Sequence, residues 1–146
     1  MLSRRSAPVA LSWSALDLPW DASAAGVGTI YDRGSQQFHL LLHEEAVNTS
    51  GSRLLWLEVL PQRLTLTMQG DGQSHFRHLF KPGATGSSHF WVGEQRLDVA
   101  NFTRALRIDY ASRTSKIPQQ VYLEYELWLS HQRLGVYHLD AKIDCE

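Results

Sequence analysis

The sequence has a single cysteine, Cys145, next to its C-terminal residue, so no disulfide can form within the chain. It also lacks any run of 18 apolar residues, which excludes a transmembrane helix, and we expect no membrane partner. Charge of one sign is missing as well, because 14 Lys and Arg oppose 15 Asp and Glu for a net charge of −1. We therefore expect no nucleic-acid partner, since such binding depends on a positive field.

What remains is an ordinary globular composition. The chain has 146 residues, of which 43% are hydrophobic and 20% charged. A chain of this length can bury one self-sufficient core. We therefore expect a single domain over residues 1–146.

The dominant periodicity of the chain is two residues, which is the signature of extended strands. In residues 121–129 an apolar face alternates with a face formed by Tyr122, Glu124, Glu126 and Trp128. Similar patterns predict strands over 9–13, 26–31, 37–45, 53–60, 63–69, 74–80, 89–92, 95–99 and 103–110, and a last strand after residues 130–133. Turn-forming residues separate them, including all of 81–88.

Helix signals are weak, and only a short helical turn within residues 14–25 fits the pattern. A long series of antiparallel strands must remove its sheet edges, and closure is the simplest way to do so. The sequence therefore predicts an all-β fold, a closed antiparallel meander barrel of about 8–10 strands.

The N-terminal segment allows two interpretations. Arg4 and Arg5, the apolar residues that follow and the small residues at 22–25 have the layout of an export signal. Against this, Ser12, Ser14 and Asp17 interrupt the apolar region, and residues 9–13 alternate as a strand does. We favour a strand here and a cytoplasmic protein.

Several strand patterns together resemble one family. They are Phe38-His-Leu-Leu-Leu-His-Glu-Glu45, Leu64-Thr-Leu-Thr-Met-Gln-Gly70, His75-Phe-Arg-His-Leu-Phe80 with Pro82-Gly83, Arg96-Leu-Asp-Val99, Leu106-Arg-Ile108 and Val121-Tyr-Leu-Glu-Tyr-Glu-Leu127. In these segments the chain resembles the bacterial YwiB-type family of calycin-like (lipocalin-like) β-barrels. The resemblance implies a closed barrel of eight or more strands in the bacterial cytoplasm. It implies no established activity and no catalytic residue.

Glu44 is the first candidate for a site. Glu44 and Glu45 are adjacent, so in a strand they point to opposite faces and cannot form an acid/base pair. If Phe38, Leu40 and Leu42 face the interior, Glu44 follows them inward. Its carboxylate then either orients a ligand at the barrel mouth or pairs with an arginine such as Arg53 or Arg63.

The histidines do not have the spacing of a metal site. In a strand His39 and His43 share a face but lie about 13 Å apart, and His75 and His78 point to opposite faces. His78 shares its face with Phe76 and Phe80, which makes it either a polar contact for a ligand or a hydrogen-bonded core residue. We predict no metal and no cofactor.

Three functional hypotheses follow. The leading one is non-enzymatic binding of a small apolar or amphipathic ligand inside the barrel, with Glu44, Phe76, His78 and Tyr125 as ligand contacts. Its predicted lining consists of Leu40, Leu42, Leu64, Leu66, Phe76, Leu106, Leu123 and Tyr125.

The alternative is a protein-interaction or homodimerisation module with a filled barrel. In that case the outer face bearing Tyr122, Glu124, Glu126 and Trp128 meets a partner. The third hypothesis is hydrolysis or isomerisation by Glu44 with His78, which requires the two side chains to be within about 3.2 Å of each other or of a shared water. We expect no enzyme, because a nucleophile elbow, a glycine-rich phosphate loop and a paired-cysteine motif are all missing from the sequence.

Overall fold

The computed structural model describes residues 3–17, 21–34, 37–44, 53–60, 62–70, 74–92, 94–112 and 117–144. These ranges contain ten β-strands. They are β1 (Ser3–Ala15), β2 (Asp21–Gly34), β3 (Gln37–Glu44), β4 (Arg53–Leu60), β5 (Arg63–Gly70), β6 (Ser74–Phe80), β7 (Thr85–Val92), β8 (Gln95–Asp109), β9 (Gln120–Leu129) and β10 (Gln132–Ile143). None of the described residues forms a helix that is long and apolar enough to cross a membrane.

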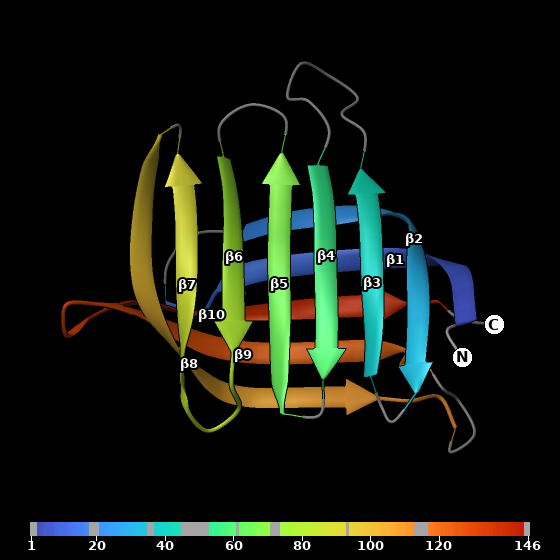
Figure 1. Cartoon of the computed structure of the whole chain (residues 1–146). Coiled ribbons are helices and arrows are strands. Elements are labelled where there is room, and N and C mark those ends of the chain that lie inside the picture. The colour runs from blue at the N-terminus through green and yellow to red at the C-terminus, as the bar shows by residue number, and fades with distance from the viewer. Residues whose placement is uncertain are drawn as a thin grey trace.

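The ten strands close into a barrel. Each strand pairs antiparallel with the next, and β1 pairs with β10 to complete the ring. Figure 1 shows that β3 to β7 form one layer, which crosses a second layer containing β1, β9 and β10, while β2 and β8 bend from one layer into the other. The predicted all-β fold, a closed antiparallel meander barrel, is confirmed.

The first strand is part of this ring. Val9 and Trp13 are buried, and Val9 lies opposite both Gly26 of β2 and Ile143 of β10. Neighbouring Gly28 allows the close packing, because a Cβ atom there would lie 2.7 Å from Val9 Cγ2. The strand predicted over residues 9–13 is confirmed, and it extends over residues 3–15.

The middle of the barrel is packed with apolar side chains. Leu42, Leu64, Leu66 and Leu123 have 0% exposure, and Leu40 has 1%. A lumen wide enough for a water molecule would expose the side chains that line it, so these residues fill the central interior. All eight residues predicted for the interior lie on the inner face, with Phe76 and Leu106 only partly buried.

Two predicted boundaries were wrong. Residues 95–109 form one continuous strand with a bulge between Thr103 and Ala105, where we predicted two strands. Strand β7 begins at Thr85, within the region predicted as a turn. The reason is the same in both places, because polar residues occupy inward positions and interrupt the apolar alternation. The helical turn considered within residues 14–25 is absent from the described part of that segment, which is strand and bend.

Candidate functional site

Three of the four predicted ligand contacts meet inside the barrel. The ring of His78 lies 5.0 Å from that of Phe76 and 5.7 Å from that of Tyr125, measured between centroids. Phe80 and Phe90 lie 5.1 and 5.3 Å from the same imidazole. Because these rings come from β6, β7 and β9, the aromatic cluster joins the two layers of the barrel.

A chain of hydrogen bonds fixes His78. Its Nδ1 atom lies 2.6 Å from Ser88 Oγ, and Asn101 Nδ2 donates to Ser88 Oγ at 2.9 Å and to the carbonyl oxygen of Leu79 at 3.0 Å. Both amide hydrogens of Asn101 are thus used. The Ser88 hydroxyl accepts one of them and is also hydrogen-bonded to His78 Nδ1, so it links the amide of Asn101 to the imidazole.

This environment keeps His78 neutral. Burial, together with a smaller effect of the nearby His89, lowers the pKa of its imidazole to about 3. Burial also raises the pKa of the Tyr125 phenol. The interior therefore holds two titratable side chains in their uncharged forms at neutral pH.

The Asn101 amide also explains why Gly86 lies beside it. A Cβ atom on Gly86 would lie 2.0 Å from the Leu79 carbonyl oxygen and 2.7 Å from Asn101 Oδ1. The side chain of Asn101 therefore crosses β7 at the glycine to reach β6. Among the described residues, Asn101 Oδ1 and Thr103 Oγ1 are buried and have no hydrogen-bond partner. Asn101 lies on β8, which turns from one layer into the other (Figure 1), two residues before the bulge that begins at Thr103.

The short distance between Ser88 and His78 does not make a catalytic pair. Ser88 has 0% exposure and His78 has 3%, so a substrate cannot reach the hydroxyl. An imidazole with a pKa of about 3 is also a poor general base, since such a base works best when its pKa is near the operating pH. The sequence-level interpretation of His78 as a hydrogen-bonded core residue is the one that the contacts support.

Glu44 is not part of this cluster. It ends β3 opposite Arg53, three strands before β6, and its side chain lies outside the described part of the structure. Arg53 pairs with Gly70, whereas His78 pairs with Leu66. That register places the Glu44 and His78 backbones about 14 Å apart across the sheet and about 13 Å apart along it. The predicted Glu44–His78 acid/base site is therefore wrong.

One end of the barrel is less tightly closed than its middle. Phe76, Phe90 and Tyr137 are only partly buried, although they pack against the core. Leu97 is the cross-strand partner of Phe90 and therefore shares its inner face, and Leu97 is 48% exposed. Leu129, at the end of β9, is 37% exposed. We call these five side chains the aromatic mouth.

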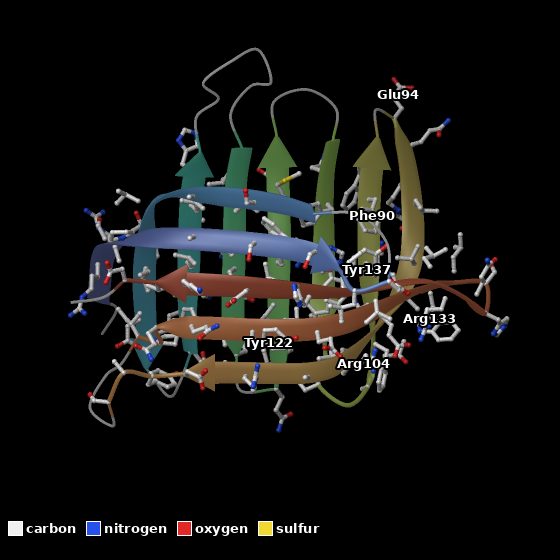
Figure 2. The ribbon with its side chains drawn as sticks, turned by 180° about the vertical axis from the view of Figure 1, so that it is seen from behind. Phe90, Glu94, Arg104, Tyr122, Arg133 and Tyr137 are labelled. Atoms are coloured by element: carbon white, nitrogen blue, oxygen red, sulfur yellow. The ribbon has the colours of Figure 1, made fainter. Side chains whose placement is uncertain are left out.

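Figure 2 shows Phe90 and Tyr137 toward the same end of the barrel, with Arg133 farther out in that direction. The Tyr137 ring stacks on Tyr125 with 5.6 Å between centroids, so the mouth is continuous with the His78 cluster. Burial raises the pKa of the Tyr137 phenol, and the charge of Asp17 raises it further. The mouth is therefore apolar and uncharged down to its floor.

The outer face proposed for partner binding is occupied by contacts within the chain. Arg104 Nε lies 3.2 Å from Glu124 Oε2 and 3.7 Å from Glu126 Oε2. Tyr122 donates to Glu124 at 3.2 Å, and Trp128 donates to Glu126 at 2.8 Å. Figure 2 shows Arg104 and Tyr122 in the layer of β8 and β9. All four residues of the predicted face thus have intramolecular partners.

Sequence reasoning missed Ser88 and Asn101, which complete the His78 cluster. Ser88, Asn101 and His78 each lie on a different strand, and only the strand register brings them together.

Within the described residues, no group of three His, Cys, Asp or Glu side chains could hold a metal ion.

The comparisons with known proteins concern the fold. No family model matches the chain, and no curated protein matches it either. One solved structure does: the crystal structure of the YwiB protein from Bacillus subtilis matches with a TM-score of 0.61 and 12% sequence identity, over 96% of this chain and 94% of that chain. The predicted resemblance is confirmed at the level of the fold, and this chain has a YwiB-type fold.

Proposed function

We propose that this protein is a non-enzymatic, cytoplasmic binding protein for a small apolar or amphipathic ligand, which it holds at the aromatic mouth. The observation that carries the proposal is the contrast along the inner face. The central leucines are buried, whereas Leu97, the cross-strand partner of Phe90, and Leu129, at the end of β9, expose large apolar surfaces. Apolar side chains that remain exposed on a concave inner face are typical of ligand sites.

The surrounding charges favour an amphipathic ligand with an anionic head. Arg133 is exposed toward this end of the barrel (Figure 2), on the outer face that it shares with its cross-strand partner Trp128. The ligand's apolar tail would pack on Phe76, Phe90 and Leu97, while its anionic head would stay in solvent at the rim, where Arg133 adds positive charge. Phe76 keeps its predicted role in this proposal, and His78 and Tyr125 form the floor beneath the tail.

The test is a titration with two anionic amphiphiles, dodecanoate and the fluorescent probe 1-anilinonaphthalene-8-sulfonate. We expect saturable binding that is weakened about tenfold by Leu97→Glu, which places a carboxylate in the apolar mouth. Val27→Glu is the matched control, because Val27 is 68% exposed on β2 and its replacement should leave binding unchanged. No saturable uptake of either probe, or equal binding by both variants, would refute the proposal.

Homodimerisation through the outer face of β8 and β9 is the second candidate. Phe102 favours it, because this phenylalanine is 37% exposed and pairs with Glu126, beside Trp128. Light scattering after size-exclusion chromatography would show a dimer that Phe102→Glu converts to a monomer. A wild-type monomer at all concentrations would eliminate this candidate.

A further inference from the structure

A hollow lies on the outer wall of the barrel. It has a volume of about 440 Å³ and is lined by outward-facing residues of β4 to β7, together with Phe76, which also belongs to the aromatic mouth. The strand register explains its shape. Thr67 of β5 lies between Trp56 of β4 and Arg77 of β6, so a short side chain separates two long ones. Thr65 repeats this pattern two residues along β5, and the threonines form the floor of a groove.

Tryptophan rings stand on both sides of this groove. Trp56 is 43% exposed, and its ring lies 5.9 Å from that of His39, which is itself held by Glu58 at 3.0 Å. On the other side Trp91 stacks on His75 with 4.6 Å between centroids and 14° between planes. Each indole is therefore supported by a histidine, and the two rings are oriented before any ligand binds.

The polar side chains of the groove differ in their hydrogen bonds and ion pairs from those of β8 and β9 on the opposite wall. Thr65, Thr67, Gln69 and Arg77 make no side-chain hydrogen bond or ion pair within the described structure. On β8 and β9, by contrast, Arg104 is paired with two glutamates. The groove thus presents donors and acceptors that are free to bind another molecule, whereas the opposite wall satisfies its own.

The charge of the groove selects the class of ligand. Arg77 is a cation and Glu58 an anion within the same lining, and the whole chain carries a net charge of −1. A phosphorylated ligand would be repelled by Glu58 and would meet one arginine. A neutral polyhydroxylated ring fits better, because its apolar face can stack on an indole while its hydroxyls both donate and accept.

We propose that the groove between Trp56 and Trp91 on the outer wall binds a neutral carbohydrate. The sugar ring stacks on Trp56 or Trp91, and its hydroxyls bond to Thr65, Thr67 and Gln69. The groove lies on the outer wall and the aromatic mouth on the inner face, and Phe76 belongs to both linings. The test therefore uses Trp56 and Thr67, which belong to the groove and not to the mouth.

The test follows the five indole N–H signals of the full chain in two-dimensional NMR spectra, with maltopentaose, cellopentaose and tri-N-acetylchitotriose as probes. We expect at least one sugar to shift the signals of Trp56 and Trp91 and to leave that of Trp128 unchanged. Trp56→Ala should weaken binding about tenfold, and Trp128→Ala, on the opposite wall, should not. Thr67→Val removes only a hydroxyl and should weaken binding severalfold while leaving the melting temperature unchanged.

Adenosine monophosphate serves as the probe for a phosphorylated ligand. Binding of this nucleotide at Trp56 and Trp91, with no response to any sugar, would overturn the assigned ligand class. Unshifted indole signals with all three sugars at their highest soluble concentrations would overturn the site itself, as would equal shifts at all five tryptophans.

Discussion

The buried neutral imidazole of His78 makes the stability of the protein depend on pH. Its pKa is lowered to about 3 in the folded chain, against an ordinary value of 6.5 that the unfolded chain regains. Between these values the unfolded state binds a proton that the folded state does not, so the free energy of unfolding falls as pH falls. The slope is about 1.4 kcal/mol per pH unit. From pH 7 to pH 5 the folded state should lose about 2 kcal/mol through this residue alone.

The assay is urea unfolding followed by tryptophan fluorescence at pH 7, 6 and 5. The wild type should lose about 2 kcal/mol more than His78→Gln across this range, because glutamine does not titrate. His39, whose pKa is also lowered by burial, adds a slope of the same sign to both proteins and cancels in the difference. His43→Gln, at an exposed position on β3, is the matched control and should keep the wild-type slope. Identical slopes for the wild type and His78→Gln would show that His78 is solvated and would refute the reasoning.

Three further perturbations test the packing. Leu66→Ala removes a fully buried side chain and should destabilise the fold by about 2–5 kcal/mol in urea unfolding, whereas a loss below about 1 kcal/mol would indicate an empty interior. Gly86→Ala should prevent folding, because the Cβ of the alanine would lie 2.0 Å from the Leu79 carbonyl oxygen. Circular dichroism measures this, and a folded variant would contradict the close approach of Gly86 to β6. Arg104→Ala should change stability by less than about 1 kcal/mol, since its pair with Glu124 is exposed, and a larger loss would show a tighter network.

The sequence predicted the barrel wherever one face is purely apolar. In β9, Val121, Leu123, Tyr125 and Leu127 are all buried, as their alternation indicates. The prediction worked because a period of two places every second side chain on the same face of a strand. Closure of the ring also followed, since a meander of short strands leaves two edges that can pair with each other.

The sequence did not predict the buried polar contacts between β7 and β8, for the following physical reason. Ser88 and Asn101 are polar residues at inward positions, so the alternation that marks a strand is lost at each of them. Their hydrogen bonds to each other and to His78 stabilise them there. Those contacts depend on the strand register, which the alternation within single strands does not reveal.

The groove on the outer wall escaped prediction for a related reason. Trp56, Thr67 and Arg77 lie on three consecutive strands and are ordinary residues for outward strand positions. Only the pairing of β4 with β5 and of β5 with β6 places them in one row. Glu44 shows a related limit of alternation, because alternation along one strand gives no distance from Glu44 to His78, which lies three strands away.

The most direct test of the account is a methyl NMR experiment with a spin-labelled fatty acid, because it distinguishes a mouth-bound ligand from one inside the barrel. The account predicts that the bound spin label broadens the methyl signals of Leu97 and Leu129, which are exposed at the mouth. The signals of Leu64, Leu66 and Leu123 in the sealed centre should stay sharp. Broadening of those three central leucines, with Leu97 unaffected, would contradict the claim that the barrel is packed in its middle and binds at its end.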